Sequence, residues 1–162
     1  MEQLFVKSAD GFRAAAPSIV CEAATKYVFK QVNDERPFIK GPESAKEFIK
    51  HQAGLDHEQF GVIYLNGDGR LLKVEILGVG DSDTTLVNIR KLCKTALDEA
   101  AEGVIVFHNH PSGEATPSKN DIAATIKLKL ALKLFNIALL DHYIIGNDKI
   151  FSFREEFKGF DD

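Results

Sequence analysis

Cysteines, long apolar runs and an excess of positive charge are all missing or scarce in this chain of 162 residues. The two cysteines, Cys21 and Cys93, lack C-x-x-C spacing, which favours reduced, buried thiols over a disulfide or a zinc pair. No apolar run approaches the roughly 18 residues of a membrane span. Residues 1–7 lack the basic start and apolar core of a signal peptide. We therefore expect a cytoplasmic protein with no membrane partner.

The charge balance argues against nucleic acid as the main partner. The formal net charge is -4, so the chain has no overall cationic field to hold a polyanion. Hydrophobic residues make up 44% of the chain and charged residues 27%, which suits one globular domain able to bury a core. Internal repeats and low-complexity segments are absent from the sequence.

The pattern along the chain predicts a short lead-in followed by one main domain. Residues 1–36 form the lead-in, with a loop over residues 8–17 and a strand within residues 19–32. The main domain covers residues 37–162. Its strands and helices alternate after an antiparallel hairpin around the turn Asn66–Gly69, which predicts an α/β fold with a mixed sheet.

Within this domain, periodicity predicts the elements one by one. We expect a helix from Pro42, hairpin strands over 58–65 and 71–77, a helix over 86–101 ended by Gly103, a buried strand over 104–108, a helix over 119–135, a strand over 137–145, an edge strand over 150–153 and a loosely packed tail from Arg154. On the helix over 119–135, the residues four apart predict a buried row: Ile122, Ile126, Leu130 and Leu134.

A cluster of polar residues follows the buried strand, and it suggests a metal site. His108 and His110 are two apart, so on a strand they point to the same face. Asp121 returns from the first turn of the next helix. Two histidines and one carboxylate with a fourth position open are the ligands of a catalytic zinc. The same ligand set also accepts iron or manganese.

Each half of this cluster also has a simpler explanation. Ser118 followed by Asp121 at the third helical position is typical of a helix N-cap. The two histidines are acceptable as polar residues at the end of a strand. We favour the metal site because the two halves occur together at this spacing, and a capped helix is in any case a rigid mount for Asp121.

The full pattern resembles a known family. His108-x-His110, seven residues, then Ser118-x-x-Asp121 resembles the JAMM motif of the JAB/MPN metalloproteases. The string HNHPSG and the later Leu140-Asp141-His142 resemble the bacterial RadC family within that superfamily, over about residues 37–153. HNH nucleases share only the tripeptide, because their motif is spread along a ββα unit.

The resemblance implies a three-layer α-β-α JAB/MPN domain similar in architecture to cytidine deaminases. It implies one zinc ion per chain, held by His108, His110 and Asp121, and a glutamate on an upstream strand as the general base. Glu58 matches that place, Glu75 is the rival, and an exposed acid at a strand end is the simpler alternative. Ser118 is expected to stabilise the oxyanion if its cap leaves it able to do so.

Further residues are candidates for orienting a ligand or contacting substrate. Asp141 and His142 interrupt a buried strand and must find partners there, with or without a connection to the metal. Arg90 falls where the family tends to carry an arginine, although an exposed helix arginine is an equal alternative. Ser112 and Gly113 turn the chain across the site. The loop over residues 81–84 departs from the family pattern, which puts its substrate contacts in doubt.

The sequence therefore predicts a zinc metallopeptidase or isopeptidase that cleaves an amide bond of a peptide or protein. One alternative is a DNA-repair-associated protein, as the RadC name suggests, but the acidic charge and the absence of a helix-hairpin-helix pattern in residues 1–36 disfavour it. The other alternative is a catalytically silent binding module. The complete set of ligands, base and serine argues against a closed structural site.

Overall fold

The computed structural model describes residues 5–8, 11–14, 36–80 and 87–160. These residues fall into two compact units, Met1–Glu35 and Arg36–Asp162. The strand expected within residues 19–32, the loop at residues 81–84 and Cys21 lie outside the described residues.

The first unit contains a short hairpin. Strands β1 (Phe5–Ser8) and β2 (Gly11–Ala14) pair antiparallel, with Phe5 opposite Ala14 and Ser8 opposite Gly11. The loop predicted over residues 8–17 is therefore wrong for Gly11–Ala14. The alanine-rich sequence has no strand pattern of its own there, and the pairing with β1 supplies the backbone hydrogen bonds that make it a strand.

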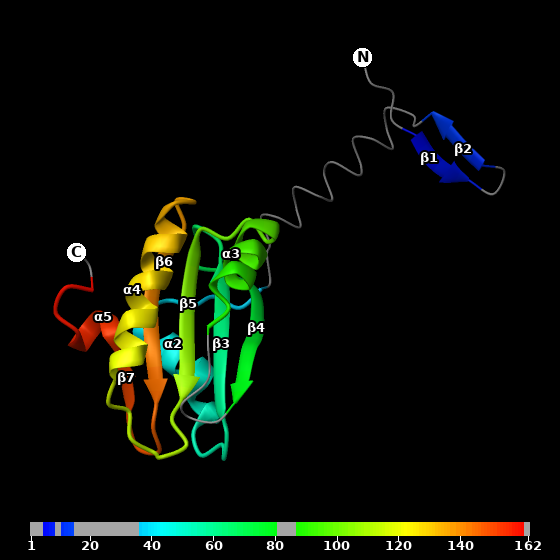
Figure 1. Ribbon diagram of the computed structural model, residues 1–162. Helices are drawn as coiled ribbons and strands as arrows, with labels where there is room; N and C mark the ends of the chain where they lie inside the picture. The colour runs from blue at the N-terminus through cyan, green and yellow to red at the C-terminus, as the bar shows by residue number, and fades with distance from the viewer. Residues whose placement is uncertain (1–4, 9–10, 15–35, 81–86, 161–162) are drawn as a thin grey trace. The chain divides into compact units, whose positions relative to one another are not determined.

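The second unit alternates helices and strands after an antiparallel hairpin, as the sequence predicts. In chain order it contains α2 (Pro42–Ile49), the short 3-10 helix η1 (Lys50–Gln52), β3 (Glu58–Leu65), β4 (Leu71–Gly80), α3 (Ile89–Asp98), β5 (Gly103–Asn109), α4 (Lys119–Lys133), β6 (Ala138–Ile145), β7 (Ile150–Ser152) and α5 (Phe153–Glu156). Figure 1 labels these helices and strands, apart from η1.

Five strands form one mixed sheet in the order β4-β3-β5-β6-β7. β5 and β6 run parallel, and the other three pairings are antiparallel. The central strand β5 is buried along its whole length, as its uninterrupted apolar run predicts. In the pairing with β3, Phe60 lies opposite His108. The start of β3 therefore reaches the same end of the sheet as the histidines.

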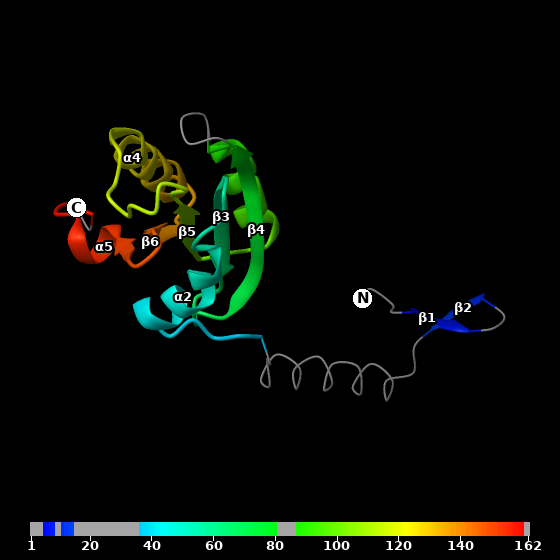
Figure 2. The ribbon, with the colours of Figure 1, turned by 90° about the horizontal axis from the view of Figure 1, so that it is seen from below.

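Helices cover both faces of this sheet and make three layers. Figure 2 shows α2 on one side of the strands and α4 on the other. The alternation along β3 explains the division, because Val62 and Tyr64 pack in the core under α3 and α4, whereas Ile63 and Leu65 pack toward α2. This is the α/β architecture expected of a JAB domain.

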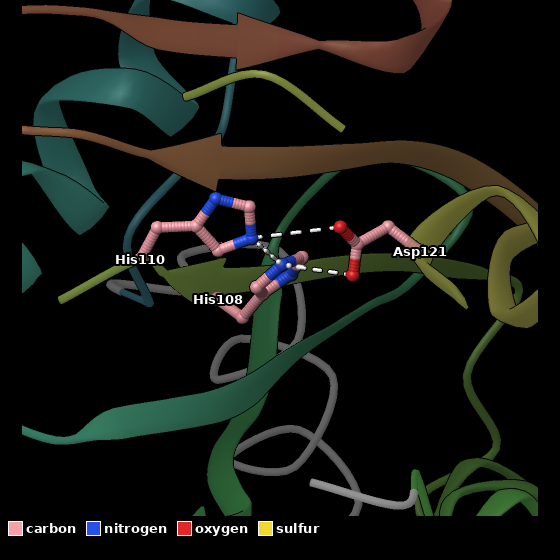
Figure 3. A group of neighbouring side chains, drawn as sticks. All are labelled: His108, His110 and Asp121. Atoms are coloured by element: carbon pink, nitrogen blue, oxygen red, sulfur yellow. Dashed lines mark hydrogen bonds and ion pairs between the residues drawn. The ribbon is translucent and has the colours of Figure 1, made fainter. Parts of the chain in front are cut away.

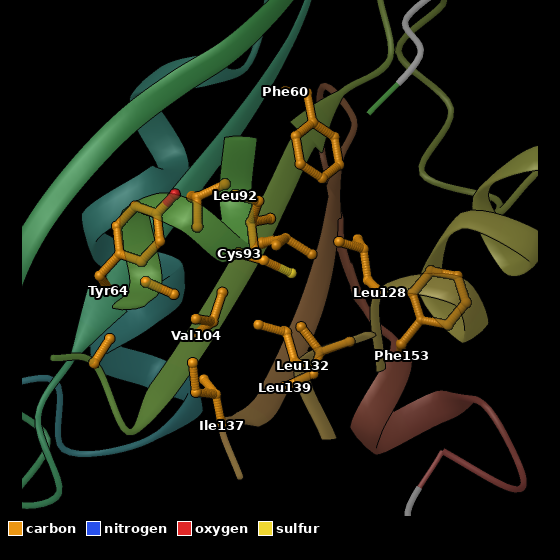
Figure 4. Packing of buried hydrophobic residues seen from close by; sticks show 14 of the residues in the cluster. Phe60, Tyr64, Leu92, Cys93, Val104, Leu128, Leu132, Ile137, Leu139 and Phe153 are labelled. Atoms are coloured by element: carbon orange, nitrogen blue, oxygen red, sulfur yellow. The ribbon is translucent and has the colours of Figure 1, made fainter. Parts of the chain in front are cut away.

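The larger core lies between the sheet and the pair α3 and α4 (Figure 4). Its buried members include Phe60, Tyr64, Leu92, Cys93, Val104, Leu128, Leu132, Ile137, Leu139 and Phe153. Cys93 is a buried free thiol, as expected, and burial raises its pKa. The end of the sheet that carries His108 is therefore supported by a packed core.

Helix α4 does not bury the row that the sequence predicts. Ile126, Leu130 and Leu134 are 51%, 61% and 82% exposed, and the helix instead buries Thr125, Leu128 and Leu132. Residues four apart advance by about 40° around a helix at each step, so a four-apart row drifts away from any fixed face. Asp121, Thr125, Leu128 and Leu132 alternate four and three apart and stay on one face, which also carries the candidate metal ligand.

Two other predictions need correction. Helix α3 ends at Asp98, and Ala100, with a φ of 51°, makes the turn; Gly103 begins β5. A Cβ on Gly103 would lie 2.7 Å from a Leu140 side-chain atom, so its small size serves packing rather than helix termination. The tail from Arg154 is not loose, because Phe160 is 5% exposed in the larger core and Phe157 packs against that core and contacts the Phe153 ring.

Candidate metal centre

The centre begins where β5 ends. His108 and His110 are two residues apart in an extended chain, so both side chains face the side of the sheet that α4 covers. Asn109, between them, points to the other side and is 1% exposed. The alternation predicted from the sequence is therefore what brings the two imidazoles together.

Asp121 comes from the first turn of α4, whose N-terminus lies over the same end of the sheet. The Ser118 hydroxyl accepts a hydrogen bond from the Asp121 N–H at 3.1 Å, and the Ser118 N–H donates to Asp121 Oδ2 at 2.7 Å. This capping box fixes the start of the helix. Asp121 therefore belongs both to the helix cap and to the candidate ligand group.

The three side chains converge (Figure 3). His108 Nε2 lies 3.0 Å from His110 Nε2 and 3.2 Å from Asp121 Oδ1, and His110 Nε2 lies 3.5 Å from Asp121 Oδ2. Tetrahedral ligands about 2.1 Å from a zinc ion are about 3.4 Å from one another. The three separations lie close to this value, so the group could hold a small divalent metal ion.

The outer nitrogen of His110 supports this assignment. His110 Nδ1 lies 2.7 Å from the carbonyl oxygen of Glu114, which can only accept, so Nδ1 carries a proton, and in the neutral imidazole Nε2 keeps its lone pair. The side chains of His110 and Asp121 are 17% and 16% exposed, whereas that of His108 is 2% exposed. The group is open to solvent on one side, as a site with a free coordination position requires.

The electrostatics also favour a cation. Burial opposes the charged form of Asp121, but hydrogen bonds with His108 and His110 outweigh it and hold the pKa of Asp121 well below its usual value. The hydrogen bond with Asp121 in turn raises the pKa of His110, and the charge of Glu58 contributes to the same shift.

Glu58 lies at the start of β3 and is 8% exposed. Continuing the pairing of Phe60 with His108 sets Glu58 beside His110, where its charge acts on that imidazole. Glu75 lies elsewhere: its carboxylate contacts Lys91 at 2.8 Å and accepts from Thr95 at 3.2 Å, both on α3. Of the two glutamates considered from the sequence, Glu58 is the one beside the histidines.

Asp141 and His142 are separated by the alternation of β6. His142 faces the candidate ligands, with Nε2 2.9 Å from His108 Nδ1. Asp141 faces the other way, where it accepts from the Ser152 hydroxyl at 2.6 Å, and it also accepts from the backbone N–H of His142 at 2.7 Å. Asp141 therefore secures β7 to β6, whereas His142 contacts a ligand directly.

The remaining candidates lie at the edge of the centre or away from it. The Ser112 hydroxyl accepts from the Glu114 N–H at 3.3 Å, inside the turn that follows His110. Gly113 has a φ of 83°, and a Cβ there would lie 2.4 Å from the Asn147 side chain, so turn geometry explains this glycine. Arg90 is exposed in the first turn of α3, and no contact of the described residues joins it to the ligand group.

Sequence reasoning did not single out two residues of this centre. Asn109 accepts from the Gln59 N–H at 2.8 Å and donates to the His57 carbonyl at 2.9 Å, so it ties β5 to the residues on either side of Glu58. Thr125 lies 2.6 Å from both the Asp121 carbonyl oxygen and His142 Nδ1. A signal for Thr125 was its place one turn after Asp121, and for Asn109 its place between the histidines.

These features define an α/β domain with a His-His-Asp group able to hold a metal ion at the end of its central strand. The family model of the RadC-like JAB domain matches residues 39–159. The chain belongs to this family.

Curated relatives agree with this assignment. The chain is similar to a UPF0758 protein of Leptothrix cholodnii (38% identity; 84% of this chain and 61% of the relative) and to the UPF0758 protein YeeS of Escherichia coli K12 (38%; 83% and 91%). A UPF0758 protein of Staphylococcus carnosus is 38% identical over 75% of this chain and 54% of its own. The chain thus spans about three fifths or less of some relatives and most of YeeS. None of the described helices is long and apolar enough to cross a membrane.

Proposed function

We propose that this protein is a metal-dependent hydrolase that cleaves an amide bond in a peptide or protein, with His108, His110 and Asp121 holding one zinc ion. The observation that carries the proposal is the convergence of two imidazole Nε2 atoms and a carboxylate within hydrogen-bonding distances, open to solvent on one side. A bound zinc ion polarises a water molecule and lowers its pKa toward neutrality. Membership of a JAB family, which includes hydrolases, supports the same class.

The protein groups around this position have complementary roles. Glu58 accepts a proton from the attacking water and passes it to the leaving nitrogen as the carbon–nitrogen bond breaks. Ser118 uses an oxygen lone pair for its cap, which does not consume its hydroxyl proton, so it can still donate to the developing oxyanion. The alternative of a protein acting on DNA has no comparable support, since the net charge is -4.

The metal content of the protein purified without added metal tests the site. We expect about one zinc ion per chain, because one His-His-Asp group holds one ion. We expect a His108→Ala/His110→Ala variant to lose that zinc. A His51→Ala/His57→Ala variant is the matched control, because those histidines belong to the same protein but lie outside the ligand group. A protein without metal, or metal kept by the first variant, would remove the hydrolase mechanism.

The role of Glu58 is tested separately. Glu58→Gln keeps the shape of the side chain but cannot accept a proton, so we expect it to retain zinc and lose turnover by a factor of about 10² or more. The control is Glu75→Gln, whose carboxylate binds α3. A screen of peptide and isopeptide substrates, with and without a chelator, supplies the assay. Full activity of Glu58→Gln would exclude Glu58 as the base.

A further inference from the structure

His142 is fully buried in β6 and is packed on several sides. Its ring stacks on Phe153 with the centroids 4.9 Å apart and the planes at 7°, and Phe60 contacts it edge-on at 6.0 Å. Its polar contacts are Nε2 to His108 Nδ1 at 2.9 Å and Nδ1 to Thr125 Oγ1 at 2.6 Å. A buried imidazole whose two nitrogens hydrogen-bond to a candidate ligand histidine and to a threonine has a fixed orientation.

The direction of each hydrogen bond follows once His108 binds a metal through Nε2. His108 Nδ1 must then carry the proton and donate a hydrogen bond to His142 Nε2. A neutral His142 has one N–H, so its Nδ1 donates to Thr125 Oγ1. The Thr125 hydroxyl then donates to the Asp121 carbonyl oxygen at 2.6 Å, a group that can only accept.

We propose that His142 and Thr125 are positioning residues that hold His108 in the tautomer and orientation needed to bind the metal, and that couple it to Asp121. This inference rests on the metal site proposed above. We call the hydrogen-bonded series His108–His142–Thr125–Asp121 carbonyl the relay. It joins the strand that carries His108 to the helix that carries Asp121. Ligand histidines with a fixed outer hydrogen bond bind metals more tightly, typically by a factor of about 10 to 100.

The two ligand histidines are held in different ways. His110 donates to a backbone carbonyl in its own turn, whereas His108 depends on a side chain from another strand. Phe60 stacks on His108 at 6.1 Å and 19° and limits its rotation from the β3 side. Substitution of His142 should therefore affect His108 specifically and leave the His110 hydrogen bond intact.

The first experiment reads the tautomers by long-range ¹H–¹⁵N NMR on the zinc-loaded full chain. We expect the proton of His142 on Nδ1, with Nε2 accepting, and the proton of His108 on Nδ1. A His142 ring with its proton on Nε2 would overturn the relay even if zinc were bound. A purely structural buried histidine would not need this tautomer.

The second experiment measures zinc affinity by competition with a chromophoric chelator. His142→Phe keeps an aromatic ring against Phe153 but has no acceptor for His108, and we expect its affinity to fall by about tenfold or more. His142→Gln can present a carbonyl oxygen near the position of Nε2, so we expect it to recover most of that loss. Equal affinities for wild type and His142→Phe would overturn the proposal.

Thr125 provides an independent arm that does not alter the buried imidazole. Thr125→Val keeps the side-chain shape and removes the acceptor for His142 Nδ1–H, so zinc affinity should fall, and Thr125→Ser should restore it. Thr95→Val is the matched control, because Thr95 is also a buried helix threonine with one side-chain hydrogen bond, to Glu75 on β4. An equal loss in Thr95→Val would show a general packing effect and overturn the relay.

The two proposals fail in distinguishable ways. If the wild-type protein binds no zinc, the proposed function fails, and the relay fails with it. If the wild-type protein binds zinc, His108→Ala/His110→Ala does not, and the His142 and Thr125 variants bind as tightly as wild type, only the relay is overturned.

Discussion

The protonation of individual residues sets the charge of the candidate metal centre. Hydrogen bonding with Asp121 raises the pKa of His110 above 6.5, and the pKa of Asp121 is held below 3.8. In the metal-free protein, the raised His110 pKa adds stability that is lost as the pH rises through that pKa. The lowered Asp121 pKa adds stability that is lost as the pH falls through it. The pair is therefore most stabilising between about pH 4 and 6.5.

Metal binding at the proposed site should show the opposite dependence on His110, because a ligand imidazole must be neutral. We expect the apparent zinc affinity to fall as the pH is lowered, beginning above the ordinary imidazole pKa of about 6.5. Competition titrations between about pH 8.5 and pH 5.5 would measure this fall. An affinity that stays constant down to about pH 6 would contradict the coupling of His110 to Asp121.

A second prediction for a single residue concerns Asn109, whose side chain lies on the face of β5 opposite His108. Asn109→Ala leaves the partly buried Gln59 N–H and His57 carbonyl without their side-chain partner, and we expect a loss of about 1–3 kcal/mol in the free energy of unfolding. Since both contacts flank Glu58, turnover should fall while zinc content is kept. The control is Asn66→Ala, which removes two side-chain hydrogen bonds from the turn at the other end of β3. A similar loss of turnover in both variants would argue against a specific role for Asn109.

At the scale of elements, the loop after β5 is held against the turn after β6. The Asn147 N–H donates to the Gly113 carbonyl, and the His110 N–H donates to the Ile145 carbonyl, both at 2.9 Å. Gly113 combines a φ of 83° with a close approach to Asn147. This loop also carries the Glu114 carbonyl that fixes the tautomer of His110. Backbone strain here should therefore reach the metal centre.

Gly113→Ala tests this connection. We expect it to lower the free energy of unfolding by about 1–3 kcal/mol through strain at positive φ, and to weaken zinc binding as His110 shifts. Gly54→Ala is the control, because Gly54 also has a positive φ, of 76°, but a Cβ there would meet nothing within 4 Å. Chemical denaturation and the chelator competition assay supply the two readouts. Unchanged zinc affinity in a destabilised Gly113→Ala would mean that the loop supports the fold alone.

At the scale of the whole molecule, the candidate ligands join two layers of the second unit, the sheet and a helix that covers it. His108 and His110 end the central strand, and Asp121 begins the helix that covers it. Any ligand that binds only the folded state stabilises it by mass action, by about 2.7 kcal/mol at a free concentration one hundred times the dissociation constant. Metal binding should therefore stabilise the entire second unit rather than a local loop.

We expect zinc to raise the Tm by several degrees and a chelator to reverse the change, as measured by calorimetry. The His108→Ala/His110→Ala variant should show neither response. An equal rise in that variant would mean that zinc binds elsewhere on the chain, and would remove the link between the centre and the stability of the fold.

The sequence alone was enough to predict the α/β class, the mixed sheet, the buried strand over 104–108 and the grouping of the two histidines with Asp121. These features depend on local rules: alternation along a strand, the turn at Asn66–Gly69 and the cap at Ser118. Such rules involve residues close together in the chain, so they can be applied to the sequence alone.

Only the tertiary structure decided which face of α4 packs on the sheet and which partners the buried polar residues take. The sequence predicts burial of the apolar residues four apart. The face with Asp121, Thr125 and Leu128 packs on the sheet instead, because residues alternately four and three apart stay on one side of the helix. The contact of His142 with His108 and the tie from Asn109 to β3 depend on strand order and register, which bring residues 34 and 50 positions apart within 3 Å. Those pairings follow from the packing of whole elements, which no local pattern encodes.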